Sequence, residues 1–98
     1  MNKLSEEVKD EKKVLRISGS SPVKETAGSI AKAYESGHHN IELRAIGASA
    51  ISQMVKSIAT ASSIFAQKGL ILTTRFGYDM TTIEGNEKTV IVAILKAE

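Results

Sequence analysis

Three arginines are the residues of this chain best suited to binding chemistry. Arg16, Arg44 and Arg75 each lie in a stretch of alternating residues, and alternation turns each of them to the outer side of its strand. A guanidinium group binds phosphate oxygens in a planar fork. The arginines therefore suggest a phosphate-binding surface. Glu42 lies on the same side as Arg44, so an ion-paired or interface network is an equally open interpretation.

A second candidate for anion binding is the start of the segment that follows Gly47, in which Lys56 is the only charge up to residue 63. Gly47 and Ser49 would place backbone N–H groups and a hydroxyl at a helix N-terminus, which suits a phosphate. The many Ala and Ser residues are also explained by tight packing in a small domain. Exposed small residues around Gln53 and Ser57 offer a further possibility, a dimer seam.

The sequence contains no arrangement that indicates catalysis. It has no cysteine, no Ser/His/Asp or paired-carboxylate pattern and no glycine-rich loop of the P-loop type. His38 and His39 are adjacent in a turn, with no third metal ligand nearby in the sequence. We therefore expect a protein that is not an enzyme, with no metal site and no cofactor.

Length and composition indicate one small cytoplasmic domain. The chain has 98 residues, of which 42% are hydrophobic and 24% charged, so we expect a charged flexible tail over residues 1–13 and one domain over 14–98. No apolar run approaches the roughly 20 residues that cross a bilayer, and the N-terminus does not resemble a signal peptide. The net charge of +2 is a weaker basic bias than a dedicated nucleic-acid binder carries.

The elements that must position these residues follow from periodicity and from helix-end signals. We expect strands at 14–18, 38–46, 70–83 and 88–95, the last two joined by a turn around Gly85–Asn86. The first helix should have Ser21 as N-cap, Pro22 as its first residue and Gly37 at its end. The order β-α-β-α-β-β predicts an α+β fold, in which two helices cover one face of a four-stranded mixed sheet.

Apolar positions predict the core and one open surface. In the second helix one side should carry Ile51, Val55 with Met54, Ile58, Ser62 and Phe65, and Phe76 should also be buried. The last strand is apolar on both faces, which predicts a central strand that is covered on both sides. Because two helices cover one face only, we expect a second copy of the chain to cover the other.

Three segments also resemble a known family. AIGASAISQMVKSIATA is similar to the signature of the stage V sporulation protein S family of bacteria, and SSPV and EGNEKTVIVAI fit the layout of that family. The resemblance runs from about Val14 to Lys96. That family in turn resembles Alba, the archaeal chromatin protein, which shares the β-α-β-α-β-β order. Alba-like proteins are dimers that bind DNA or RNA through the loop after the first strand, the start of the second helix and the long hairpin.

The resemblance implies binding positions, and the sequence departs from several of them. Ser20 and Ser21 stand where Alba places a lysine pair, and Glu84 and Glu87 lie near the hairpin tip. Fewer phosphate contacts predict binding of moderate to weak affinity that is sensitive to salt. The candidate nucleic-acid-binding residues are Arg16, Ser20, Ser21, Lys24, Arg44, Gly47, Ser49, Lys56, Arg75 and Lys88.

The sequence therefore predicts a small nucleic-acid-binding regulator, a homodimer or higher homo-oligomer that acts in sporulation or related gene control. Its partner would be DNA or RNA, and we expect no association with membranes. The alternative is a protein-interaction module that has kept the fold and lost nucleic-acid binding.

Overall fold

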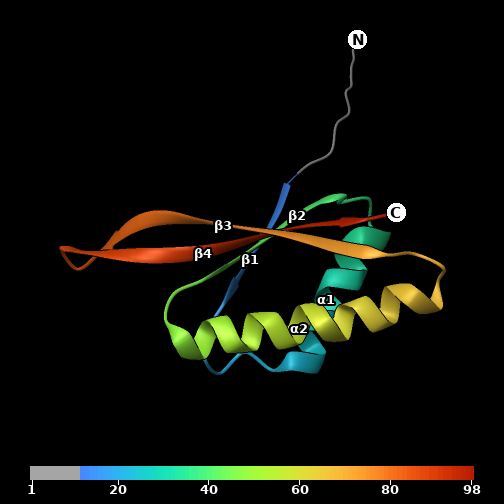
Figure 1. The fold of residues 1–98 in the computed structure, drawn as a ribbon, viewed down its shortest axis with the longest axis horizontal. Coiled ribbons are helices and arrows are strands. Elements are labelled where there is room, and N and C mark those ends of the chain that lie inside the picture. The colour runs from blue at the N-terminus through green and yellow to red at the C-terminus, as the bar shows by residue number, and fades with distance from the viewer. Residues whose placement is uncertain (1–11) are drawn as a thin grey trace, which may run out of the picture.

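The computed structural model describes residues 12–98, in which two helices lie on one face of a four-stranded sheet (Figure 1). The predicted fold class and element order are confirmed. The elements are β1 (Lys12–Ile17), α1 (Val23–Glu35), β2 (Asn40–Ala45), α2 (Ala48–Gln67), β3 (Leu72–Ile83) and β4 (Asn86–Ala97). Most of the expected tail lies outside the described residues, but Lys12 and Lys13, which were expected in that tail, belong to β1.

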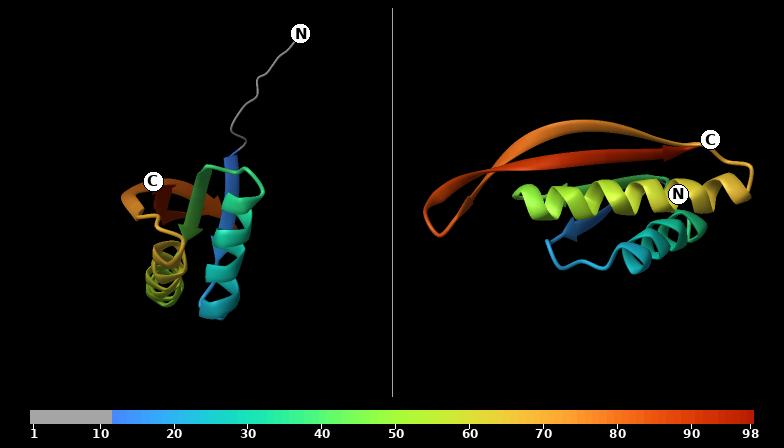
Figure 2. Two further views of the ribbon diagram at one scale, coloured as in Figure 1. Left: turned by 90° about the vertical axis from the view of Figure 1, so that its right-hand side faces the viewer. Right: turned by 60° about the horizontal axis from the view of Figure 1, so that its bottom comes forward.

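The sheet has the strand order β1-β2-β4-β3. β1 and β2 run parallel, whereas β4 is antiparallel to both β2 and β3. The prediction that β4 is central, made from its two apolar faces, is therefore confirmed. Both helices pack on the same face of the sheet (Figure 2). Neither helix is long and apolar enough to span a bilayer, among the residues that the structure describes.

Alternation in the strands correctly predicts the inner face of the sheet. Ile41, Leu43 and Ala45 of β2 are buried against the helices. Ala93 and Leu95 of β4 pair with this strand and are equally buried. The opposite face of the sheet, which we call the outer face, carries no helix (Figure 2).

The ends of α1 agree only in part with the sequence. The helix ends as expected, with Gly37 in the left-handed region at φ 98°. Its start is different: Pro22 is the N-cap, with an extended ψ of 132°, and no side chain caps the helix. Ser21 Oγ instead accepts a hydrogen bond of 2.9 Å from the backbone N–H of Ser18. The predicted cap is wrong because this hydroxyl closes the preceding turn.

The small residues of α2 allow it to pack closely against both α1 and the sheet. Ala50, Met54, Ser57, Ile58, Ala61 and Phe65 form its buried stripe. Ser57 is fully buried and donates a hydrogen bond of 2.7 Å to the carbonyl of Gln53, so a dimer seam at Ser57 is wrong. Val55, which we expected in the core, is 47% exposed. Met54, which was expected on the same side as Val55, is fully buried and faces inward.

The β3–β4 hairpin extends beyond the helices (Figure 1). Its two-residue turn is Glu84–Gly85, with φ 52° and 81°, one residue earlier than predicted. Phe65 is buried as expected, but Phe76 is 55% exposed. Phe76 lies on β3, which is an edge strand, and there the helices do not cover its side chain. The prediction of a buried Phe76 is therefore wrong.

Candidate nucleic-acid interface

A hollow of about 780 Å³ lies at one end of the outer face. We call it the outer-face hollow. Its border combines outward residues of β1 and β2, the loop between β1 and α1, the first turn of α2, and the hairpin residues Thr81, Ile83 and Val90. Four candidate binding residues line it, namely Arg16, Arg44, Gly47 and Ser49.

The loop between β1 and α1 lies against the start of α2. A Cβ atom on Gly19 would come within 2.5 Å of Ser49 Oγ, so a larger residue at this position would force the Ser49 hydroxyl to move. Gln53 Nε2, one turn further along α2, donates a hydrogen bond of 2.8 Å to the carbonyl oxygen of Ser21. The two segments that the family resemblance implicates in binding therefore form one continuous surface.

Serine hydroxyls organise this loop. Ser18 Oγ lies 3.1 Å from Ser20 Oγ and 3.3 Å from Ser21 Oγ, and the backbone N–H of Ser20 donates to Ser18 Oγ at 3.2 Å. Ser20 is exposed and Ser21 is half-buried. The hydroxyls that replace the Alba lysine pair thus supply hydrogen-bonding groups beside the hollow and no charge.

The start of α2 has the electrostatic character that an anion prefers. Gly47 is the N-cap with φ 90°, a conformation that L side chains rarely adopt, and no side-chain hydrogen bond caps the helix within the described part of the chain. Its first turn carries no acidic residue. The N–H groups at a helix start carry partial positive charge, so this end of α2 favours an anion.

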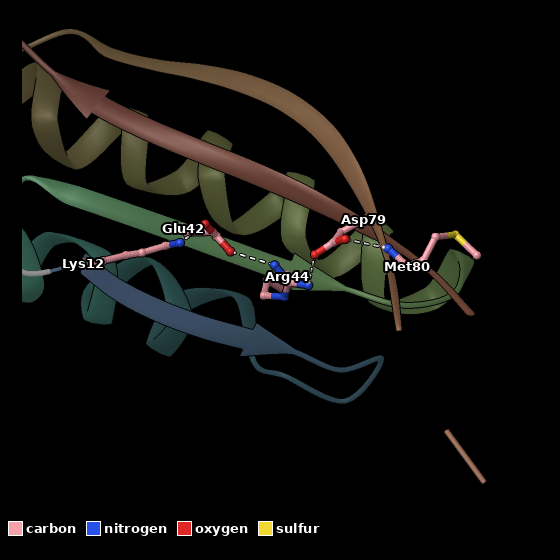
Figure 3. A network of polar contacts seen from close by, with 5 residues as sticks. All are labelled: Lys12, Glu42, Arg44, Asp79 and Met80. Carbon is pink, nitrogen blue, oxygen red and sulfur yellow. Dashed lines mark hydrogen bonds and ion pairs between the residues drawn. The ribbon is translucent and has the colours of Figure 1, made fainter. Parts of the chain in front are cut away.

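A chain of ion pairs crosses the outer face (Figure 3), and three of its members, Lys12, Glu42 and Arg44, line the hollow. Lys12 Nζ lies 2.9 Å from Glu42 Oε1, and Arg44 Nη1 lies 2.8 Å from Glu42 Oε2. Arg44 Nη2 also contacts Asp79 Oδ2 at 3.0 Å. Asp79 Oδ1 in turn accepts a hydrogen bond of 2.8 Å from the backbone N–H of Met80. These residues connect β1, β2 and β3, so the ion-pair interpretation of Arg44 is the one that the structure supports.

These contacts stabilise the charged forms of all three central groups. The hydrogen bond from Lys12 lowers the pKa of Glu42, with a further contribution from Arg44, although burial opposes both. Arg44 likewise lowers the pKa of Asp79, and the Met80 N–H adds to this effect. The hydrogen bonds to Glu42 and then to Asp79 raise the pKa of Arg44. Glu42, Arg44 and Asp79 are therefore ionised at neutral pH.

The network also explains how the chain covers the outer face of β4. Arg44 pairs with Val92 and Asp79 pairs with Val90, so the ion pair between them crosses over β4. Val90 is 2% exposed and Val92 is 9% exposed in the single chain. The burial of these two valines therefore does not require a second copy, and a second copy on the outer face stays a prediction.

The structure separates the other candidate residues from the hollow. Arg16 and Arg44 are register partners on neighbouring strands. Arg75 lies at the opposite edge of the sheet, on β3, beside a smaller hollow that also contains Lys96. The three candidate binding lysines are exposed and lie on three different elements, Lys24 on α1, Lys56 on α2 and Lys88 on the hairpin. Three guanidinium groups are thus not gathered into one site.

Two participants in the network were missed from the sequence. Lys12 was placed in the tail, and Asp79 was not considered although alternation puts it on the same face of β3 as Arg75. The strand register, which brings Asp79 within reach of Arg44, could not be obtained from the alternation alone.

The two histidines lie away from this site. The ring of His39 packs against Tyr34 with a centroid separation of 4.8 Å. His38 lines a small hollow between β1 and α1. No group of three His, Cys, Asp or Glu residues suited to holding a metal ion occurs within residues 12–98.

Comparison with known proteins gives a family and a fold. Residues 13–98 match the model of the family described as Stage V sporulation protein S. No curated protein matches the chain. Among solved structures, Alba from Thermoplasma volcanium is similar with a TM-score of 0.58 and 14% sequence identity, covering 87% of this chain and 98% of that one. At this identity the likeness demonstrates the fold alone.

Proposed function

Because the chain belongs to the stage V sporulation protein S family, we propose that it is a small regulatory protein that binds DNA or RNA in sporulation or related gene control. The outer-face hollow is the site of binding. There Arg16, Ser49 and the start of α2 contact the phosphate backbone.

The observation that carries this proposal is the convergence of three anion-binding features on one hollow. Arg16 is exposed at its border and forms no ion pair within residues 12–98, so its guanidinium is available to phosphate. The uncapped start of α2 supplies N–H groups. The Ser18–Ser21 loop, fixed against α2, supplies hydroxyls. Such contacts bind the backbone without reading base sequence.

The charge of the hairpin limits the affinity. Its outer half contains Asp79, Glu84 and Glu87 against a single Lys88. An acidic tip is repelled by phosphate, so the hairpin does not supply the dominant contact. Moderate to weak, salt-sensitive binding follows, since each phosphate contact contributes a slope of about 0.9 in log affinity against log salt.

A fluorescence-anisotropy titration with labelled duplex DNA and single-stranded RNA tests this proposal, from about 20 to about 200 mM salt. Arg16→Ala should weaken binding and reduce the salt slope by about 0.9 on duplex DNA. Arg75→Ala removes the same charge from the opposite sheet edge and is the matched control. Equal losses in both variants would contradict a site at the outer-face hollow, and no binding at the lowest salt would exclude the proposed function.

The proposal includes a homodimer, and exposed apolar residues of β3 support it. Phe76, Tyr78 and Met80 are 55%, 73% and 53% exposed and share the inner side of this edge strand. We call them the hairpin apolar strip. Exposed apolar side chains on an edge strand are typical of a contact with another chain.

The same strip supports a second candidate function, a module that binds another protein. The acidic hairpin tip and the loss of the Alba lysines favour this alternative. The two functions differ in a direct way, since the module would fail to retain nucleic acid at low salt. A substitution of Tyr78 would still weaken the binding of the module to its protein partner.

A further inference from the structure

Arg44 is held by two carboxylates whose environments differ. The side chain of Glu42 is 9% exposed and is also bound by Lys12, whereas the side chain of Asp79 is 58% exposed. Arg44 itself is 24% exposed and lines the outer-face hollow. The contact of Arg44 with Glu42 is therefore largely buried, and its contact with Asp79 is open to solvent. Figure 3 shows both contacts.

We propose that Asp79 is an internal competitor for nucleic-acid phosphate: its carboxylate occupies Arg44 in the free protein and must be displaced before Arg44 can bind a phosphate. Asp79 thereby sets the affinity of the outer-face hollow. This inference rests on the proposed function and goes beyond it by assigning a regulatory residue on the hairpin.

The geometry favours exchange at Asp79 over exchange at Glu42. A carboxylate and a phosphate present similar oxygens to a guanidinium fork. Exposed ion pairs contribute little net stability, so the contact with Asp79 is readily replaced. Moving Arg44 away from Glu42 would leave the buried Glu42 carboxylate with only Lys12 to compensate its charge, which is costly.

Arg44 is also in the right place to add to the proposed site. Arg16 is its register partner on β1, so the two guanidinium groups project from neighbouring strands on the same face. When Asp79 is released, Arg44 would join Arg16 as a second arginine that can bind phosphate. The Met80 N–H orients the Asp79 carboxylate toward Arg44, which keeps the competitor in position in the free protein.

The test compares two variants that remove the same charge from the hairpin. Asp79→Asn should raise the affinity for duplex DNA at about 20 mM salt about three- to fivefold, the size of effect expected for one exposed ion pair. Glu87→Gln, which alters an exposed acid that forms no ion pair within residues 12–98, should change it less than about twofold. Adding Arg44→Gln to Asp79→Asn should abolish the gain.

Each outcome has a distinct meaning. Equal gains in Asp79→Asn and Glu87→Gln would overturn the competition and leave nucleic-acid binding intact. No binding by the unaltered protein or by Asp79→Asn would overturn both proposals.

A second measurement does not depend on any substitution. Carbon-13 NMR of the Asp79 carboxyl group should report a chemical shift that moves when duplex DNA is added to saturation, as the carboxylate leaves Arg44. The Glu42 carboxyl resonance should keep its position. An unchanged Asp79 resonance in the complex would overturn the proposal.

Discussion

Gln53 Nε2 donates a hydrogen bond of 2.8 Å to the carbonyl oxygen of Ser21, and this contact fixes the first loop against the second helix. This bond joins the loop between β1 and α1 directly to α2. Gln53 thus positions the two segments of the proposed interface, and the proposal assigns it no contact with phosphate.

We expect Gln53→Ala to lower the free energy of unfolding by about 1 kcal/mol, the typical contribution of one hydrogen bond. Nucleic-acid affinity should fall as well, because the loop loses its position. Urea unfolding and anisotropy measure the two effects. Gln67→Ala, an exposed glutamine at the end of the same helix, is the control and should leave both unchanged.

Gly19→Ala should disturb the same junction by steric contact. The added methyl would lie 2.5 Å from Ser49 Oγ and 3.1 Å from Ser49 Cβ, so the Ser49 hydroxyl must rotate away and the two segments must separate by a few tenths of an ångström. We expect a loss of about 1–3 kcal/mol in thermal or urea unfolding. Adding Ser49→Ala should restore part of the stability.

Gly28→Ala is the matched control for this change. Apart from its chain neighbours and the backbone of its own helix, no heavy atom lies within 4 Å of the added methyl. Alanine is also favoured over glycine inside a helix. It should therefore be neutral or stabilise the protein by up to about 1 kcal/mol. A loss in Gly28→Ala equal to that in Gly19→Ala would contradict the steric account.

The ion-pair network should make stability depend on acid pH. The pKa of Glu42 is lowered in the folded protein from an ordinary value of 4.5. A group with a lowered pKa stabilises the fold fully above its unfolded value and loses that contribution as the pH falls through the folded value. Stability should therefore decrease below about pH 4.5, and Asp79, whose pKa is also lowered, adds to the effect.

Glu42→Gln checks this dependence. At pH 7 the variant should be less stable than the unaltered protein by about 1–3 kcal/mol in urea unfolding, since it loses charged hydrogen bonds to Lys12 and Arg44. The difference should shrink as the pH is lowered to about 3. Glu87→Gln should differ little from the unaltered protein at every pH, and a constant deficit in Glu42→Gln would contradict the electrostatic cause.

Tyr78→Glu should convert the proposed dimer to a monomer in sedimentation velocity. Tyr78 is 73% exposed, so its replacement should change the stability of the monomer by less than about 0.5 kcal/mol. Thr73→Glu places the same charge on the outer face of β3 and should leave the dimer intact. The reverse result would assign the dimer contact to the outer face.

Local patterns were sufficient to predict the layers of the fold. Alternation correctly assigned Ile41, Leu43 and Ala45 to the core, and a strand apolar on both faces proved to be the central β4. These predictions succeeded because burial repeats with the period of a strand. The rotation of α2 about its own axis could not be predicted in the same way. Val55 and Met54 are adjacent on this helix, and only packing against α1 and the sheet decides which of them faces inward.

The sequence by itself determined the family, the element order and the hydroxyl-rich, weakly charged character of the proposed interface. The tertiary structure alone decided what Arg44 does. Its partner Asp79 lies 35 residues away, on a strand that is not its neighbour. The contact exists because β4 lies between β2 and β3 in a particular register, and register is a property of paired strands that no single segment encodes.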